Sequence, residues 1–381
     1  MLRFLDAGES HGKCLLGIIE GIPAGLIIDE EKINKNLKKR QMGYGRGKRM
    51  EIESDQVEIL SGVISKKSIG TPIGLMIKNN DWENVKKQEW SPLPVPRPGH
   101  ADFAGALKYG FDDCRPILER ASARQTAMKV AIGSIARQFL SLFDINSFSH
   151  VIRIGRIGFE VEYDFTGEFK AKVENSKVFC ADPLLSERMC REIDDAKENG
   201  DTLGGIFEII VKGVPIGLGS HVHWDRRLDA RLAAILMGIP GVKAVEIGNG
   251  IEISKKRGSK VHDEILMTEG SLKKDNKYYR KNNNAGGLEG GISNGENIIL
   301  RAYFKPIPTL LKPLDSVDIR TGKRTKAMYQ RSDICVVPAA SVVGDALVNW
   351  EIAVAFLKKF GGDSIKEIRN NFIHFKKGLE K

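Results

Sequence analysis

Histidines in glycine-bounded turns are the residues of this chain best suited to proton transfer. His11 lies in the run Gly-Glu-Ser-His-Gly at residues 8–12, and His100 lies in Arg-Pro-Gly-His-Ala-Asp at residues 97–102. An imidazole can act as a general acid or base near neutral pH. Either histidine could instead only stabilise its turn, because each motif alone carries little information. The two turns therefore indicate a candidate site and leave its chemistry open.

Two arginines at the entrance of a predicted helix indicate anion binding. Arg120 and Arg124 flank Ser122, and small and apolar residues then repeat on one face as far as Leu142. Ser122 is suited to be the N-cap, and backbone N–H groups at such a helix start can bind an anion. Helix N-termini favour acidic residues over arginines, which suggests that both arginines face a bound anion. The alternative is a surface helix with two solvated arginines.

The charge of the chain favours a small polyanion over nucleic acid as its partner. The 381 residues carry a formal net charge of +10. Hydrophobic residues make up 41% of the chain, which is enough for a sizeable core. The arginines are dispersed over separate glycine-rich turns, a pattern that suits a concave site for a small ligand. A single-strand nucleic-acid binder would interleave aromatic and basic residues, and aromatic residues are sparse between Arg40 and Arg49.

Cysteine usage and hydropathy predict a cytoplasmic protein. The chain has five cysteines without a Cys-x-x-Cys pair, and we find no signal peptide and no apolar run of membrane-spanning length. His221, His223 and Asp225 resemble metal ligands in their spacing, but no cysteine and no second histidine pair supports them. We therefore predict a protein without a metal site.

The pattern of elements predicts one large α+β domain, because strands are joined both by short turns and by helices. The domain covers residues 1–381, with a core at about 3–355 and a basic helical tail at 356–381. We expect a surface loop at 79–96, a flap at 43–48 that carries Arg46, a flexible run at 270–284 and an exposed loop at 312–327. Strands are predicted at residues 3–6, 15–20, 57–64, 73–77, 151–159, 205–211, 242–247 and 297–304. Helices are predicted at residues 30–40, 101–111, 186–199, 228–237 and 339–360, after residue 124, and in the tail from residue 363.

Taken together, the motifs resemble those of chorismate synthase. Besides the two histidine turns, the chain has Asn-Asn-Ala-Gly-Gly-Leu-Glu-Gly-Gly-Ile at 283–292, Lys-Pro-Ile-Pro-Thr at 305–309 and Arg-Ser-Asp at 331–333. They follow the order of that family from Arg3 to about Ala355. Each motif is weak alone, but their joint occurrence is highly specific.

The resemblance implies a fold, a reaction and a cofactor. The expected fold has antiparallel β-sheets on both sides of a helical layer, and the expected assembly is a homotetramer. The reaction is the anti-1,4-elimination of phosphate from 5-enolpyruvylshikimate 3-phosphate to give chorismate, which makes the enzyme a carbon–oxygen lyase of the shikimate pathway and of aromatic amino acid biosynthesis. The cofactor is reduced FMN, with NADPH as a candidate reductant. The sequence leaves open whether the chain reduces its own flavin or depends on a separate flavin reductase.

The resemblance also implies roles for individual residues. His11 would be an acid near the substrate phosphate, Ser10 would lie by the flavin, His100 would manage a proton at flavin N1, and Asp333 would act with flavin N5 to take the substrate proton. The alternative for Asp333 is a simple ion pair with Arg331. The FMN contacts would be Arg120, Ala121, Ser122, Pro240, Gly241, Gly290, Lys305, Pro306, Ile307, Pro308, Thr309 and Arg331. The contacts to the substrate or a nicotinamide nucleotide would be Arg40, Arg46, Arg49 and Arg124.

The chain departs from the family pattern at two places. Gln41 and Met42 follow Arg40 where many members have Arg-Pro, and Ser332 precedes Asp333 where members often have histidine or a small residue. A flavin oxidoreductase with another substrate is the rival interpretation, since it would share the FMN site. It would not need so many substrate arginines, and it should oxidise a nicotinamide nucleotide without a second substrate.

Overall fold

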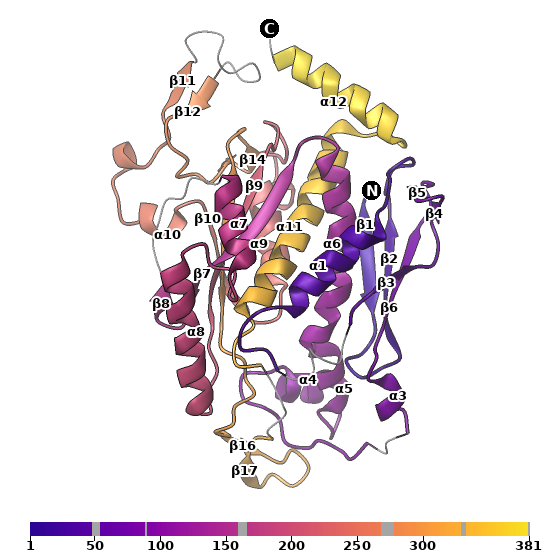
Figure 1. Cartoon of the computed structure of the whole chain (residues 1–381), viewed down its shortest axis with the longest axis vertical. Helices are drawn as coiled ribbons and strands as arrows, with labels where there is room; N and C mark the ends of the chain where they lie inside the picture. The colour runs from indigo at the N-terminus through magenta and orange to yellow at the C-terminus, as the bar shows by residue number, and fades with distance from the viewer. Residues whose placement is uncertain (48–53, 88–89, 159–165, 268–277, 329–332, 380–381) are drawn as a thin grey trace.

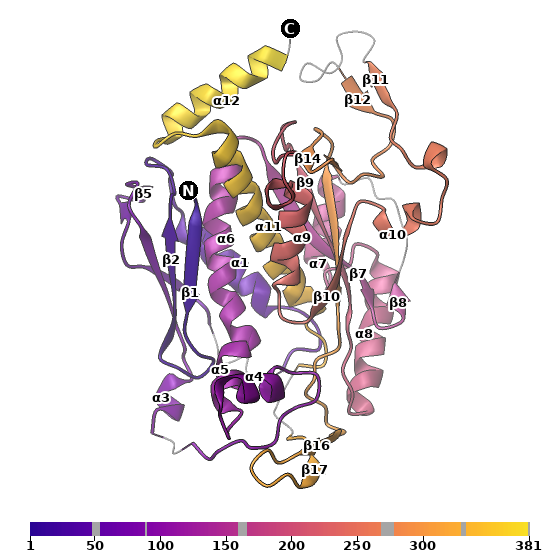
Figure 2. The same cartoon turned by 180° about the vertical axis from the view of Figure 1, so that it is seen from behind.

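The computed structural model describes residues 1–47, 54–87, 90–158, 166–267, 278–328 and 333–379. Two antiparallel sheets enclose a central layer of helices, and Figures 1 and 2 show this arrangement from opposite sides. The main helices of the layer are α1 (Glu30–Gln41), α6 (Thr126–Ser141) and α11 (Val337–Phe360). The α+β fold with sheets on both sides of a helical layer is thus confirmed.

The first sheet has four strands in the order β1 (Arg3–Ala7), β2 (Cys14–Glu20), β6 (Ile73–Lys78) and β3 (Val57–Ile59). Alternate residues of β2 point to opposite faces, so Leu15 and Ile19 are buried against the helices. Between them lies Gly17, where an added Cβ would come within 2.6 Å of Met128 Sδ on α6. The missing side chain therefore lets the sheet approach the helix closely.

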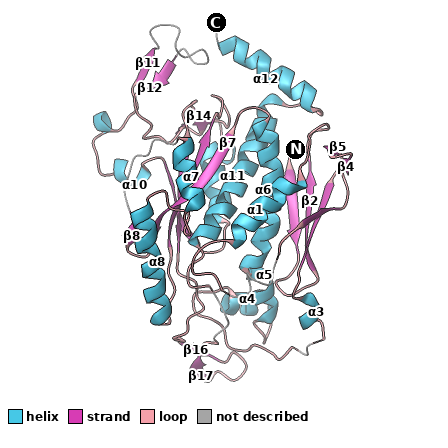
Figure 3. Cartoon of the chain, in the orientation of Figure 1, coloured by secondary structure: helices cyan, strands magenta, loops and turns pink. Residues whose placement is uncertain are grey.

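The second sheet has five strands in the order β10 (Val242–Ile247), β15 (Ile298–Phe304), β9 (Gly205–Lys212), β7 (Asn146–Ile154) and β8 (Ile157–Gly158). All neighbouring strands are antiparallel. One face packs on α11, where Phe207 of β9 lies against Gly344. Figure 3 shows this sheet and the four-stranded sheet on opposite sides of the helices.

The helices of the layer are tightly packed. An added Cβ on Gly133 of α6 would lie 2.2 Å from the carbonyl oxygen of Ala346 on α11, so the two backbones nearly touch. Helix α1 packs against the layer through the fully buried Ile33 and Leu37. We predicted no apolar run of membrane-spanning length, but α11 is long and apolar enough to cross a membrane. However, 89% of its apolar window is buried within the protein, as expected for a core helix.

The remaining elements surround this framework. The remaining helices are α3 (Trp82–Val85), α4 (Asp102–Tyr109), α5 (Arg115–Ala121), α7 (Gly167–Asn175), α8 (Pro183–Glu198), α9 (Leu228–Met237), α10 (Gly250–Ile253) and α12 (Ile365–Leu379), with 3-10 turns η1 (Ala123–Gln125), η2 (Trp224–Arg226) and η3 (Gly258–Lys260). The short strands are β4 (Val63–Ile64), β5 (Lys67–Ser68), β11 (Ile265–Met267), β12 (Tyr278–Arg280), β13 (Leu288–Glu289), β14 (Ile292–Ser293), β16 (Asp315–Val317) and β17 (Arg324–Lys326).

Most long elements were predicted, but helix α7 and most of the short strands were not. Helix α9 and strand β10 have the predicted bounds. The predicted strand at 57–64 is wrong in its second half, because the chain turns at Gly62 into the hairpin of β4 and β5. Helix α5 lies where the sequence predicted no element, and β16 and β17 pair within the predicted loop at 312–327. Part of the expected flexible run at 270–284 lies outside the described residues.

Candidate active site

The turn that carries Ser10 and His11 is held by helix α5. Both oxygens of the Glu119 carboxylate contact His11, one accepting from the backbone N–H at 2.7 Å and the other lying 2.8 Å from ring Nδ1. The Ser10 backbone N–H donates to the Glu119 carbonyl at 3.0 Å, and the Ser122 hydroxyl donates to the Ser10 hydroxyl at 3.0 Å. The structure therefore brings Ser10, His11 and Ser122 together, as the resemblance implies.

The turn that carries His100 is built around a buried carboxylate. Asp102 contacts His100 Nδ1 and accepts from Arg97 Nε at 2.8 Å. Burial raises the pKa of Asp102, but the hydrogen bonds from His100 and Arg97 lower it more, to about 2. Asp102 is therefore ionised at neutral pH, and it fixes both the arginine and the imidazole ring.

The segment Lys305–Thr309 lies directly against this turn. Arg97 NH1 donates to the Thr309 hydroxyl at 3.4 Å, and Lys305 Nζ donates to the Gly99 carbonyl. Burial lowers the pKa of Lys305, and no carboxylate among the described residues forms an ion pair with its ammonium group. An ammonium, a hydroxyl and a guanidinium thus lie within one small region, a donor set that suits a phosphate group.

Two of the predicted substrate arginines share one buried carboxylate. Asp55 Oδ2 lies 3.3 Å from Arg40 NH1, and Asp55 Oδ1 pairs with Arg124 NH1. The three side chains are at most 5% exposed. Burial, with Arg46 and Arg124 nearby, lowers the pKa of Arg40 to about 10 despite Asp55. The cluster therefore concentrates guanidinium groups in a buried site, a setting that suits an anionic ligand.

Arg120 and Arg124, which were predicted to face a bound anion, each also contact a carboxylate of the protein. Arg124 pairs with Asp55 and donates to Asn79 Oδ1 at 2.7 Å. Arg120 donates to the Asp6 carboxylate at 3.0 Å and to the Gly8 carbonyl at 3.2 Å. Both partners come from segments far away in the sequence, so spacing around the helix entrance could not reveal them. Ser122 does act as an N-cap, but it caps η1 and not α6 directly.

Asp333 pairs with Arg46 across the end of the helical layer. The Arg46 NH1 to Asp333 Oδ2 distance is 3.1 Å, and the Gly47 N–H donates to Asp333 Oδ1. Gly45, in the predicted flap, accepts from the Ile334 N–H at 2.8 Å. Both Arg46 and Asp333 act on the charge of Arg40, so these residues belong to one electrostatic cluster. Arg49 and Arg331 lie outside the described residues.

The predicted flavin contacts are only partly brought together. Pro240 and Gly241 lie next to Lys305, whose N–H donates to the Gly241 carbonyl at 2.9 Å. Gly290 lies beyond the opposite end of β15, beside β14, which Figure 1 shows far from α4 and α5. An added Cβ on Gly290 would meet nothing within 4 Å, so no neighbouring backbone requires a glycine here. The positive φ of Gly290, 58°, is the reason for the glycine.

The site contains residues that the sequence analysis missed. They are Asp55, Asn79, Glu119, Thr126 and the pair Arg97–Asp102. Asn79 links two regions, because its Oδ1 accepts from Arg124 while its Nδ2 donates to the Gly12 carbonyl at 2.7 Å. Asp102 could have been found from its position two residues after His100. Asp55 and Glu119 have no local signal, since their partners are up to 108 residues away.

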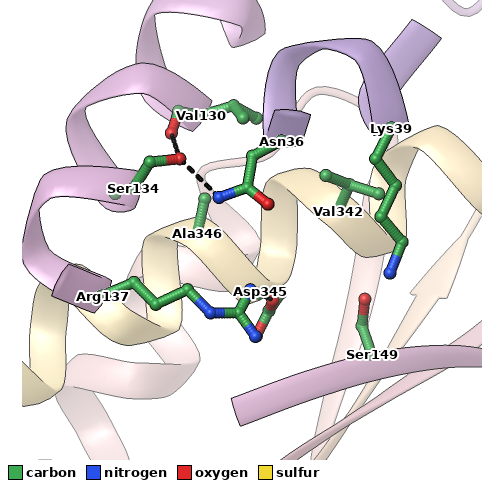
Figure 4. Close-up of a pocket in the computed structure, with 10 residues that line it drawn as sticks. Asn36, Lys39, Val130, Ser134, Arg137, Ser149, Val342, Asp345 and Ala346 are labelled. Carbon is green, nitrogen blue, oxygen red and sulfur yellow. Dashed lines mark hydrogen bonds and ion pairs between the residues drawn. The ribbon is translucent and has the colours of Figure 1, made fainter. Parts of the chain in front are cut away.

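A small cavity lies elsewhere, between α1, α6, α11 and β7. Figure 4 shows Asn36 donating to Ser134 and Arg137 facing Asp345 beside it. Its volume of about 10 Å³ leaves room for about one water molecule. The cavity is thus too small for a substrate. His223, considered above as a metal ligand, pairs instead with Asp225 at 2.8 Å, and both side chains are more than half exposed.

Fold and site together define an α+β protein whose candidate site combines two histidine–carboxylate pairs with buried arginines. A family model described as chorismate synthase matches residues 2–357. A chorismate synthase from Caldicellulosiruptor bescii is 52% identical over 381 residues, covering 97% of this chain and 98% of that protein. One from Alkaliphilus metalliredigens is 53% identical, covering 98% of each. A solved structure titled "Crystal Structure of Chorismate Synthase" has a TM-score of 0.81 and 41% identity, covering 100% of this chain and 98% of that one.

The chain therefore belongs to the chorismate synthase family. Chorismate synthase is a lyase of the shikimate pathway, and membership in the family implies a requirement for reduced flavin.

Proposed function

We propose that this chain converts 5-enolpyruvylshikimate 3-phosphate into chorismate by anti-1,4-elimination of phosphate, with reduced FMN bound in the same site. The observation that carries the proposal is the buried cluster of Arg40 and Arg124, whose guanidinium groups both contact the carboxylate of Asp55. A substrate with two carboxylates and a phosphate offers several anionic groups to such guanidinium groups. Guanidinium groups suit it because each can form two parallel hydrogen bonds to carboxylate or phosphate.

The reaction needs two proton transfers, one to the departing phosphate and one from the substrate carbon, and we assign them to different residues. His11, held by Glu119, donates a proton toward the departing phosphate, and Arg40, Arg46, Arg49 and Arg124 bind the anionic groups of the substrate. Asp333 receives the proton that the substrate loses. The Arg46 contact at 3.1 Å holds this carboxylate in place. His100 holds a proton on its imidazole, which is oriented by Asp102.

The residues around Lys305 fit a flavin phosphate. Lys305, Thr309 and Arg97 present a cation, a hydroxyl and a guanidinium in one region. When bound, reduced FMN would supply a transient source of electron density without net oxidation of the substrate. NADPH is the proposed reductant of the flavin, used either by this chain or by a separate reductase. The proposed FMN contacts are Ser10, Arg120, Ala121, Ser122, Pro240, Gly241, Gly290, Lys305, Pro306, Ile307, Pro308, Thr309 and Arg331.

We further propose that the protein is a cytoplasmic homotetramer that assembles partly through the outer face of the four-stranded sheet. Leu5, Leu16 and Ile18 are 72%, 42% and 53% exposed there. The register places Leu5 beside Ile18 and Leu16 beside Met76, so these side chains form one apolar patch. Contiguous patches of this kind are typical of protein–protein interfaces.

An anaerobic assay tests the proposed function. Purified protein, substrate and chemically reduced FMN should yield chorismate and phosphate in equal amounts, while the flavin stays reduced. One nicotinamide oxidised per product, or full activity without flavin, would contradict the proposal. Replacing chemically reduced FMN by FMN and NADPH then shows whether the chain reduces its own flavin. Two results would instead favour the rival flavin oxidoreductase. These are steady oxidation of NADPH in the absence of the phosphorylated substrate, and no chorismate formation when that substrate is added.

A further inference from the structure

Glu119 contacts the Ser10–His11 turn at three separate points. Its two carboxylate oxygens contact the His11 backbone N–H and ring Nδ1 at 2.7 and 2.8 Å, and its carbonyl accepts the Ser10 N–H at 3.0 Å. The Glu119 side chain is 13% exposed and the His11 side chain 26%. A single glutamate on α5 thus fixes both the backbone of the turn and the plane of the imidazole.

The contact with Glu119 also determines the tautomer of the His11 ring. A carboxylate only accepts hydrogen bonds, so Nδ1 must be the protonated nitrogen in the pair. Burial raises the pKa of Glu119, but the hydrogen bonds from His11 and the nearby charges of His11 and Arg115 lower it more. Glu119 is therefore an anion at neutral pH, and it can compensate the positive charge that His11 has when Nε2 also carries a proton.

The surroundings of this pair restrict its motion further. The His11 ring packs edge-on against Trp90 with 5.8 Å between ring centroids, and the Arg115 guanidinium lies over the Trp90 ring at 4.3 Å from its centroid. Arg115 is thus the cation that acts on Glu119 from its own helix. The ring is held by hydrogen bonds at one edge and by an aromatic contact, which is the arrangement expected of a preorganised acid.

The second histidine shows why Glu119 is distinctive. Asp102 contacts His100 in the same way, but Asp102 also accepts from Arg97 Nε, NH2 and backbone N–H. Its negative charge is therefore shared with a guanidinium. The carboxylate oxygens of Glu119 contact the backbone N–H and the ring of His11, so the hydrogen bonds of this carboxylate within the described residues all go to that one residue.

We propose that Glu119 is the positioning residue of His11: it orients the ring through Nδ1 so that Nε2 presents the proton delivered to the leaving phosphate. This inference rests on the acid role of His11 in the proposed function. It adds a residue to the proton-delivery half of the reaction. The arrangement follows the general logic in which a carboxylate sets the tautomer and orientation of a catalytic histidine.

The first test replaces Glu119 by glutamine, which keeps the shape and removes the charge. In single-turnover assays at saturating reduced FMN, Glu119→Gln should lower the rate about 10- to 100-fold with little change in KM, because orientation and not substrate binding is lost. The alkaline limb of its pH–rate profile should move to lower pH, since the imidazolium loses its counter-charge. Asp112→Asn is the matched control, because Asp112 is 76% exposed near α5 and pairs with Arg320.

A double-mutant cycle separates this inference from the proposed function. His11→Asn should be at least as slow as Glu119→Gln, and adding Glu119→Gln to His11→Asn should cost little more, because Glu119 acts through His11. An active His11→Asn variant would contradict the acid role of His11 itself. If His11→Asn is inactive but Glu119→Gln has the rate and the pH profile of the wild type, only the role of Glu119 is overturned.

Nitrogen-15 NMR of the wild-type protein gives a test that does not depend on the folding of a variant. The His11 resonance, assigned by its loss in His11→Asn, should show a protonated Nδ1 in the neutral ring. A neutral His11 protonated at Nε2 would overturn the proposal, because Nδ1 would then have no proton to donate to Glu119.

Discussion

At the scale of single residues, the site is a set of charged side chains that share partners. Asp55 serves two arginines, and Asp102 serves one arginine and one histidine. Removing one partner of such a buried pair leaves the other partner without compensation, which costs more than the pair contributes. The arginine cluster is therefore suited to bind an anion, and its carboxylates hold it together until the anion arrives.

Asp333→Asn should slow the chemical step while leaving the fold and flavin binding intact. The asparagine keeps one oxygen, which can accept from Arg46 or from the Gly47 N–H, but it cannot take a proton from the substrate. We expect a rate loss of about 10²- to 10⁴-fold. The measurement is single-turnover chorismate formation with substrate deuterated at the carbon that loses its proton.

The isotope effect provides the control for this prediction. Since His11 still serves phosphate departure, C–H cleavage should become more rate-limiting in Asp333→Asn and the isotope effect should increase. A wild-type rate with an unchanged isotope effect would mean that Asp333 only pairs with Arg46.

The pKa of Asp102 predicts a contribution to stability that depends on pH. Because the folded-state pKa of about 2 is below the ordinary value of 3.8, the contribution is fully present above pH 3.8 and is lost as the pH falls toward 2. Its size is about 2 kcal/mol. Urea unfolding of the wild type and Asp102→Asn from about pH 6 to about pH 2.5 should show a difference in unfolding free energy that shrinks toward acid pH. A difference independent of pH would contradict the assignment, and Asp112→Asn serves as the exposed control.

At the scale of elements, the helical layer depends on the close crossing of α6 and α11. Gly133→Ala should destabilise the protein by about 1–3 kcal/mol, because the added Cβ would lie 2.2 Å from the Ala346 carbonyl oxygen. Since Arg124 lies just before α6 and Asp333 just before α11, a shift of this crossing would also disturb the site. Thermal and urea unfolding measure the first effect, and substrate affinity measures the second.

The matched control for Gly133→Ala is Gly378→Ala in α12. An added Cβ there would meet nothing within 4 Å, so the better helix propensity of alanine should make this variant neutral or slightly more stable. Equal effects of the two substitutions would show that the crossing can relax without cost.

The sequence predicted elements where the apolar pattern was long, and it failed where structure depends on distant contacts. Helix α9 and strand β10 have clear periodicity and were predicted with their observed bounds. Helix α5 is only 7 residues long, and no long apolar period marks it. The same limit applies to the site: the motifs identified Ser10 and His11, but Glu119 became visible only when the fold brought α5 beside their turn.

At the scale of the whole molecule, the two sheets have different outer faces. On the five-stranded sheet, Glu208 contacts His150 at 2.9 Å and Arg301 at 2.7 Å. Glu208 and His150 are buried, and the His150 ring packs against Phe169 of α7. The four-stranded sheet instead exposes Leu5, Leu16 and Ile18. Its charged residues flank the apolar patch, as in the exposed pair Arg3 and Glu20. An apolar centre with a polar rim is the usual anatomy of a subunit interface.

Ile18→Glu should therefore weaken the proposed tetramer without unfolding the chain. Ile18 is 53% exposed and lies beside Leu5 in the register of β1 and β2, so a glutamate is solvated in the free subunit and desolvated in an interface. Sedimentation velocity should show the wild type as a tetramer and Ile18→Glu as a smaller species, with unchanged circular dichroism. Leu184→Glu is the control, because Leu184 is 74% exposed at the start of α8 and the variant should keep the wild-type mass. If Ile18→Glu also keeps that mass, the subunits associate through another surface and this face of the sheet remains in contact with water.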